Sequence, residues 1–230
     1  MSYRHEKKYV LTYQEYLIIK NKIKHIFDED SNHHNGSYNV YSVYFDDYLN
    51  TAYLEKVAGI QNRYKYRIRT YNLNSETLKF ETKIKNNEYI TKEIFEINQE
   101  EYNQMINLDY THLLMSNNQE KQKIYYDLKK HMYKPKVAIK YQREAYLLKG
   151  TNLRITFDHQ ISILTNTKDI LSDENYSNVF DKEIIILEIK YANQFPKLIA
   201  NLLVSNGVVQ QSFSKYEYAM KRKERGVIRW

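Results

Sequence analysis

The stretch YKYRIRTY, residues 64–71, alternates basic residues with residues that favour β-strands. Side chains two positions apart lie on the same side of a strand, so Arg67 and Arg69 share one face and Tyr66 and Ile68 the other. Two guanidinium groups on one face repel each other. The stretch therefore predicts a strand whose basic face meets an anion. That anion is either a set of protein carboxylates or a ligand such as phosphate, whose oxygens fit the planar donors of arginine.

The bulk composition indicates one soluble domain. The chain has 230 residues, only 5 Gly and 2 Pro, and no linker-like segment, so we expect a single domain over residues 1–230. The absence of Cys excludes a disulfide framework and thiolate chemistry, and it is compatible with a reducing compartment. No apolar run approaches the roughly 20 residues of a transmembrane helix. We therefore expect no transmembrane segment and a cytoplasmic location.

The net charge of +7 and the isoelectric point near 9.1 indicate a polyanionic partner. Nucleic acid, an anionic membrane and a phosphate compound all satisfy this condition. Net charge alone does not separate them, so the positions of the charges along the chain have to decide.

Periodicity predicts a mainly antiparallel sheet with helices at the start, middle and end of the chain, which is the α+β class. Ser, Thr or Asn followed three residues later by Glu marks helix starts at Thr12, Asn98 and Ser214. The strands are expected at residues 4–10, 37–45, 64–71, 77–85, 88–97, 136–148, 153–164 and 183–191. The helices are expected at residues 12–27, 50–57, 98–106, 119–132, 196–203 and 214–223, and residues 165–181 are expected to form a loop.

Several of these strands carry charged residues at every second position of one face. Examples are Glu81, Lys83 and Lys85 on one strand and Glu188 and Lys190 on another. An open sheet with one solvated face would give this pattern. The other interpretation is an eight-stranded barrel, which can hold a small ligand in its interior. Because buried charges must be paired or bound, such a basic interior would require a strongly anionic ligand, for which phosphate chains with a divalent metal are the natural candidate.

Nine segments, taken in order, resemble the CYTH or triphosphate tunnel metalloenzyme superfamily. Within it they resemble the polyphosphate polymerase domain of vacuolar transporter chaperone (VTC) proteins. The segments are RHEKK (4–8), YFDD (44–47), RIR (67–69), FETKIK (80–85), TKE (91–93), YQREAY (141–146), LRITFD (153–158), LEIK (187–190) and FSKY (213–216). The resemblance covers nearly the whole chain. It implies an eight-stranded antiparallel closed β-barrel, the triphosphate tunnel, with helices packed around it.

The resemblance also implies roles for individual residues. Seven basic side chains would grip the phosphate chain during catalysis: Lys8, Arg67, Arg69, Lys83, Arg143, Arg154 and Lys215. Further substrate contacts would come from Lys85, Lys92, Lys190, Ser214 and Tyr146. Glu188, assisted by Glu6 or Glu81, would hold Mn²⁺ or Mg²⁺, which take carboxylate and phosphate oxygens.

The implied activity is transfer of the γ-phosphate of ATP onto a growing polyphosphate chain. Two alternatives remain open: hydrolysis of triphosphate or polyphosphate, and binding of polyphosphate without catalysis. The family's first strand carries two Glu residues, and this chain has Arg4 in place of the first, which weakens the case for hydrolysis. A nucleic-acid partner is not expected, because the cations alternate with carboxylates instead of forming one basic patch. The resemblance leaves open a membrane-protein partner and the oligomeric state.

Overall fold

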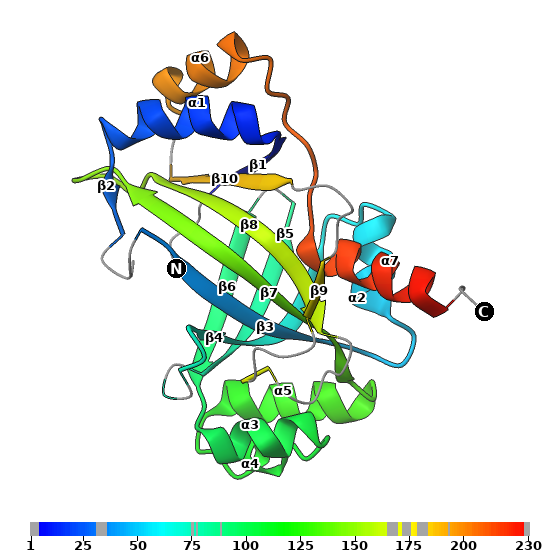
Figure 1. Ribbon diagram of the computed structural model, residues 1–230. Helices are drawn as coiled ribbons and strands as arrows, with labels where there is room; N and C mark the ends of the chain where they lie inside the picture. Colours follow the sequence, from blue (N-terminus) through cyan, green and yellow to red (C-terminus); the bar gives the residue numbers. More distant parts are fainter. Residues whose placement is uncertain are drawn as a thin grey trace.

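The computed structural model describes residues 5–30, 36–74, 76, 78–87, 89–164, 170–171, 176–178, 184–192 and 194–227 (Figure 1). The strands are β1 (His5–Leu11), β2 (Asp28–Glu29), β3 (Tyr38–Asp46), β4 (Arg63–Tyr71), β5 (Lys79–Asn86), β6 (Tyr89–Glu96), β7 (Lys134–Leu147), β8 (Arg154–Leu164), β9 (Tyr176–Asn178) and β10 (Ile185–Tyr191). The helices are α1 (Tyr13–Lys24), α2 (Thr51–Val57), α3 (Gln99–Ile106), α4 (Thr111–Leu114), α5 (Gln119–Lys130), α6 (Lys197–Ser205) and α7 (Lys215–Val227).

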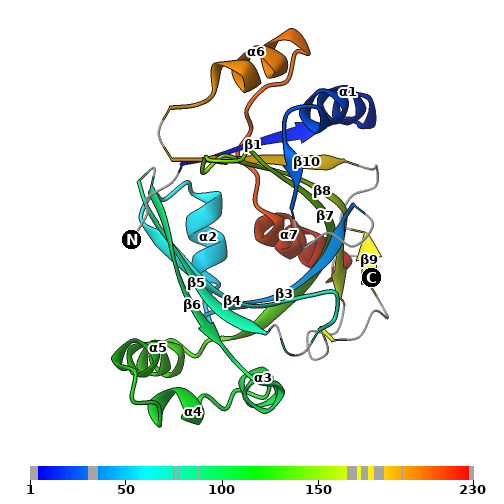
Figure 2. The same cartoon turned by 90° about the vertical axis from the view of Figure 1, so that its left-hand side faces the viewer.

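The strands form one antiparallel sheet that curls around a central space, as Figure 2 shows. Its order is β1-β10-β8-β7-β3-β4-β5-β6, with β2 beside β7 and β9 beside β8. The predicted α+β class and antiparallel sheet are confirmed, but the predicted closure is overstated. Within the described residues no strand ladder joins β1 to β6. Side chains bridge this seam instead: Lys83 Nζ lies 3.3 Å from the Glu6 carboxylate, and the His5 and Tyr89 ring centroids lie 6.0 Å apart.

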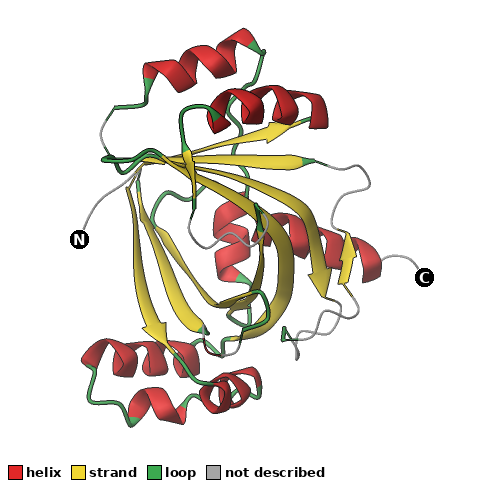
Figure 3. Ribbon diagram, turned by 60° about the vertical axis from the view of Figure 1, so that its left-hand side comes forward, coloured by secondary structure: helices red, strands yellow, loops and turns green. Residues whose placement is uncertain are grey.

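The convex face of the sheet is apolar and is covered by two groups of helices (Figures 1 and 3). Helices α1 and α6 pack over one end, where Ile19 and Ile23 join Leu187 and Ile189 in a buried cluster. Helices α3, α4 and α5 cover the other end in a cluster that contains Ile68. Burial of each such side chain stabilises the fold by about 1.5–3 kcal/mol. Apolar residues on one face and charged residues on the other thus fix which way the sheet curls.

Helices α2 and α7 lie at one end of the space enclosed by the sheet (Figure 2). Asp46, at the end of β3, connects the two helices. Its carboxylate accepts hydrogen bonds from the backbone N–H groups of Ala52 and Tyr53, each at 3.0 Å, and from the Tyr216 hydroxyl at 2.6 Å. The first turn of α2 and the start of α7 are therefore held together at the mouth of the curled sheet.

The expected elements match the observed ones closely. The capping boxes at Thr12 and Asn98 are both present, and Pro196 directly precedes α6. The structure adds three short elements that were not predicted: β2, β9 and α4, which have two, three and four residues. Segments this short do not repeat a sequence pattern often enough for it to be recognised. No helix in the described part of the chain is long and apolar enough to cross a membrane.

Candidate functional site

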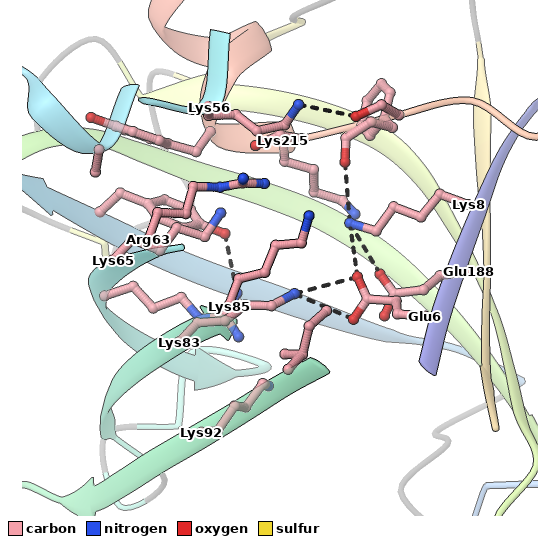
Figure 4. A pocket seen from close by; sticks show the side chains of 18 of the residues that line it. Glu6, Lys8, Lys56, Arg63, Lys65, Lys83, Lys85, Lys92, Glu188 and Lys215 are labelled. Atoms are coloured by element: carbon pink, nitrogen blue, oxygen red, sulfur yellow. Dashed lines mark hydrogen bonds and ion pairs between the residues drawn. The ribbon is translucent and has the colours of Figure 1, made fainter. Parts of the chain in front are cut away.

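A cavity of about 320 Å³ lies inside the curled sheet, between the strands and helices α2 and α7 (Figure 4). Among the described residues, twelve Lys and Arg side chains and two Glu side chains line it. Twelve of the fifteen predicted site residues line this cavity. The predicted residues found there are Lys8, Arg67, Arg69, Lys83, Lys85, Lys92, Arg143, Lys190, Ser214, Lys215, Glu6 and Glu188.

Strand register explains why residues from distant segments meet here. On neighbouring antiparallel strands, directly opposite residues lie on the same face. Lys65 on β4 lies opposite Lys83 on β5, and Lys83 lies opposite Lys92 on β6. On the other side, Lys8 on β1 lies opposite Glu188 on β10. The charged residues at every second position of each strand therefore line up across neighbouring strands, and together they form two charged walls of the cavity.

The first wall, which we call the acid-paired wall, comes from β1, β10, β8, β7 and the start of α7. Its cations each contact a carboxylate. The Lys8 ammonium lies 3.1 Å from Glu6 and 3.5 Å from Glu188, and Lys190 also pairs with Glu188. Arg143 donates two hydrogen bonds to Asp158, at 2.6 and 2.8 Å, and Lys215 pairs with the same carboxylate.

The carboxylates of this wall stay ionised despite their burial. Burial alone would raise the pKa of Asp158, but Arg143 and Lys215 lower it to about 2. Burial likewise opposes ionisation of Glu188, whose pKa is nonetheless held well below its usual value, chiefly by Lys190 and Lys8. The wall is thus a set of mutually compensated buried charges.

The second wall, the cation-rich wall, comes from β4, β5 and β6. Its seven cations are Arg63, Lys65, Arg67, Arg69, Lys83, Lys85 and Lys92. Glu81 on β5 is a buried carboxylate on this face, and it accepts from Arg67 Nε at 2.7 Å while Lys92 lies 3.6 Å away. Burial and the neighbouring Arg67 hold the pKa of Lys92 well below its usual value. Positive charge on this wall therefore exceeds what its own carboxylate compensates.

The residues present would hold a divalent metal ion only together with oxygens of a bound phosphate ligand that complete its coordination. No group of three or more His, Asp or Glu side chains that could hold a metal occurs in the described part of the chain. Glu6 and Glu188 lie together around Lys8, and the buried Thr156 hydroxyl, opposite Glu188 on β8, has no hydrogen-bond partner. Mg²⁺ is commonly bound by one or two carboxylates plus phosphate oxygens, and this pair meets that requirement. The third predicted ligand, Glu81, serves instead as the counter-ion of Arg67.

Besides Glu81, two predicted site residues are absent from the cavity lining. Arg154 belongs to the inner face of β8, opposite Lys190, but its guanidinium donates to Asp30 at 2.6 Å and to the Tyr38 hydroxyl at 3.0 Å. Tyr146 lies on the opposite face of β7, buried in the apolar cluster beneath α1. Its position does not fit the predicted contact with substrate. Three positions separate Tyr146 from Arg143, an odd spacing that places the two side chains on opposite faces of a strand.

Sequence reasoning missed three cations of the cavity. Arg63 and Lys65 share the face of Arg67 by the same period-two rule, so the signal for them was present in the sequence. Lys56 reaches the cavity from α2, where its ammonium contacts Glu217 at 3.2 Å, and no local pattern marks it. Arg4, the departure from the family's first strand, lies outside the described residues.

Comparisons with known proteins agree with this geometry. The family model described as "VTC domain" matches residues 3–223. Among solved structures, the PH1819 protein of Pyrococcus horikoshii superposes with a TM-score of 0.51 at 11% identity, covering 96% of this chain and 99% of that one. A protein of Bacillus halodurans described as a "putative adenylate cyclase" also has a TM-score of 0.51 and 11% identity, covering 93% and 96%. These identities establish a shared fold. No curated protein sequence matches.

Proposed function

The chain belongs to the VTC domain family, and from this we propose that it is a polyphosphate polymerase. The proposed reaction is metal-dependent transfer of the γ-phosphate of ATP onto the end of an inorganic polyphosphate chain inside the tunnel. Family and fold support a phosphate-related activity, and the charge of the cavity carries the finer proposal. Twelve basic side chains face two carboxylates in its described lining, an imbalance that a polyanion such as a phosphate chain would neutralise.

The cavity favours a phosphate chain over nucleic acid as the polyanion. Arg67 and Arg69 are each 6% exposed, so they are out of reach of a duplex that stays on the protein surface. A single chain of phosphates is narrow enough to enter, and each guanidinium can offer two parallel donors to one phosphate group. An absence of gel shift with unrelated DNA and RNA at physiological salt is the expected result.

Phosphoryl transfer places modest chemical demands on these side chains. The reaction needs an in-line arrangement of attacking and leaving oxygens and stabilisation of the charge on the transferring group. Buried cations that are held in place before the reaction provide that stabilisation without reorganising. We assign this role to Arg67 and Arg69, whose guanidinium groups are fixed by Glu81, by the Tyr44 hydroxyl at 3.1 Å and by the Tyr141 hydroxyl at 3.1 Å.

Mn²⁺ or Mg²⁺ would be held by Glu6 and Glu188, and when bound it would neutralise charge on the phosphate oxygens. This chain's contribution is to keep both carboxylates ionised. Burial and their mutual repulsion oppose ionisation of Glu6, yet Lys83 and Lys8 lower its pKa.

Hydrolysis of triphosphate is the second candidate, favoured by one observation. The unpartnered Thr156 hydroxyl beside Glu188 is a polar atom that could orient a water molecule. Polymerase and hydrolase would then differ in whether a phosphate oxygen or water attacks.

Incubation of the purified protein with ATP, Mn²⁺ and short polyphosphate primers tests the proposal. Growth of the chain together with ADP release supports the polymerase. Release of free phosphate from tripolyphosphate without chain growth supports the hydrolase. Neither product, combined with tight binding of polyphosphate, leaves a binding module. The variant Lys140→Met is a suitable control, because Lys140 is a sheet lysine that does not line the cavity.

A further inference from the structure

Lys65 occupies an unusual position in the cation-rich wall. Its ammonium lies 5.3 Å from the ring centroid of Tyr44 and 6.0 Å from that of Tyr216. These two rings stack on each other, with centroids 5.1 Å apart. Across the ladder, the residue directly opposite Lys65 is Lys83, another cation. The amine therefore points into the cavity between aromatic faces and a like charge (Figure 4).

The carboxylates of the cavity are engaged elsewhere. Glu6 and Glu188 pair with Lys8, and Glu81 pairs with Arg67. The charged and titratable groups that face Lys65 are Tyr44 from β3, Arg67 from β4, Lys83 from β5, Lys8 from β1 and Tyr216 from α7. Burial lowers the pKa of Lys65 to about 7, with Lys83 and Lys8 adding to the effect and Tyr44 opposing it.

Tyr44 is the group that titrates together with Lys65. Its hydroxyl accepts a hydrogen bond from Arg67 Nη1 at 3.1 Å. Burial opposes ionisation of this hydroxyl, but Arg67, Lys65 and Arg69 lower its pKa to about 7. Two interacting groups of this kind lose their protons as a pair. Near neutral pH the pair Tyr44–Lys65 therefore has a form that has lost one proton and carries no net charge.

We propose that the Tyr44–Lys65 pair takes up one proton when a phosphate chain binds, so that the Lys65 ammonium becomes part of the binding site in the complex. This inference rests on the proposed function, because it assigns a role within the same tunnel. The proton comes from solvent and forms an N–H bond at the Lys65 amine, so that a neutral amine beside a neutral phenol becomes an ammonium beside a neutral phenol. The phosphate oxygens then supply the negative charge that none of the described carboxylates places beside Lys65.

The proposal has a defined pH dependence. Binding that takes up one proton weakens by about tenfold for each pH unit above the range in which the pair titrates. We therefore expect the affinity for phosphate chains to fall as the pH rises from about 7 to 9. Lys92 and Lys190 also have lowered pKa values, so the part of the fall that belongs to Lys65 is found by comparison with a Lys65 variant.

Calorimetric titration with tripolyphosphate, in buffers of different ionisation enthalpy at pH 8, measures the protons taken up. The variants are Lys65→Arg, which keeps a permanent charge, and Lys140→Met as control. Lys140 matches Lys65 in lying 5.6 and 5.8 Å from two tyrosine rings without lining the cavity. We expect Lys65→Arg to bind tripolyphosphate and take up about one proton less than the wild type, and Lys140→Met to match the wild type. The ligand's own protonation is common to all three proteins and cancels in the difference.

Equal proton uptake by the wild type and Lys65→Arg overturns the proposal and leaves the proposed function standing. Failure of the wild type to bind tripolyphosphate overturns both. A second measurement uses the wild-type protein, so it does not depend on whether a variant folds. Acetic anhydride reacts with neutral amines, and mass spectrometry reports the rate at each lysine. We expect Lys65 to react faster than Lys140 at pH 7.5 and to be protected by tripolyphosphate. Equal rates at the two lysines, or no protection, would contradict the proposal.

Discussion

Both walls of the cavity carry lysine and arginine side chains, but the walls differ in how many of these cations contact a carboxylate. On the acid-paired wall Lys8, Arg143, Lys190 and Lys215 each contact a carboxylate. On the cation-rich wall, Glu81 contacts three of the seven cations, Arg67, Arg69 and Lys92, and Lys83 pairs with Glu6 across the seam. Removing one member of a buried pair strands its partner, whereas removing one of several crowded cations relieves repulsion. The first wall therefore contributes to the shape of the tunnel and the second to its attraction for anions.

The largest expected effect is on stability and comes from the acid-paired wall. Asp158 is fully buried and accepts from both Arg143 and Lys215, so Asp158→Ala leaves two buried cations without their partner. We expect a loss of about 3–5 kcal/mol in the free energy of unfolding, measured by urea denaturation at low salt. Asp28→Ala, which removes the exposed pair with Lys149, is the control and should cost less than about 1 kcal/mol. Equal losses in both variants would contradict the conclusion that Asp158 stabilises the fold as the partner of two buried cations.

The next effect is on turnover and comes from the cation-rich wall. Arg67→Ala removes the guanidinium that Glu81 and Tyr44 hold in place, while Lys92 and Arg69 remain beside Glu81. We expect turnover to fall by on the order of 10²–10³, with the fold retained, and Arg69→Ala to act in the same direction. Arg67→Lys, which keeps the charge without the planar fork, should recover only part of the loss. Steady-state kinetics with unchanged kcat/KM in both alanine variants would contradict the role in turnover that we assign to Arg67 and Arg69.

Ligand binding should stabilise the protein by relieving repulsion on the cation-rich wall. Tripolyphosphate at a hundred times its dissociation constant should add about 2.7 kcal/mol to the free energy of unfolding. Thermal denaturation with and without the ligand measures this, and added salt should diminish the effect by weakening binding. The same gain in the free energy of unfolding in Asp158→Ala as in the wild type, at the same tripolyphosphate concentration, would show that the two walls act independently. No shift of Tm in the wild type would argue against tunnel binding.

The smallest expected effect is at Lys92, where a substitution should change the affinity for tripolyphosphate and the stability of the fold in opposite directions. Lys92 lies opposite Lys83, so Lys92→Met removes a like-charged pair worth about 0.2–1 kcal/mol of destabilisation. Because the pKa of Lys92 is lowered in the folded state, the wild type is penalised below the unfolded pKa of about 10.4, and the penalty disappears above it. We expect the variant to be slightly more stable at pH 7 yet to bind tripolyphosphate about tenfold more weakly. A variant that is less stable than the wild type and binds tripolyphosphate equally well would contradict the assignment of this wall to anion binding.

Local patterns predicted most of the fold because each operates within a few residues. The alternation in residues 64–71 predicted both β4 and the shared face of Arg67 and Arg69, and the capping box at Thr12 predicted the start of α1. The closure of the sheet depends on how its first and last strands meet, which no single segment encodes. The sequence also does not show how far along the curled sheet an inward-facing residue lies. Arg143 and Arg154 both belong to inward faces, but only Arg143 lines the cavity.

The seam between β1 and β6 has a consequence for a polymeric ligand. A ring closed by a strand ladder would oblige a long chain to thread through its ends, because parting the ladder breaks a row of backbone hydrogen bonds. Here parting the edges disrupts the contacts of Glu6 with Lys83 and of His5 with Tyr89, among the described residues. The Glu6–Lys83 pair is partly buried, with side-chain exposures of 8% and 19%, so parting the edges costs more than breaking a surface ion pair, but it breaks no row of backbone hydrogen bonds among the described residues. We therefore expect that the proposed phosphate chain can leave sideways between β1 and β6, a route that a closed strand ladder would block.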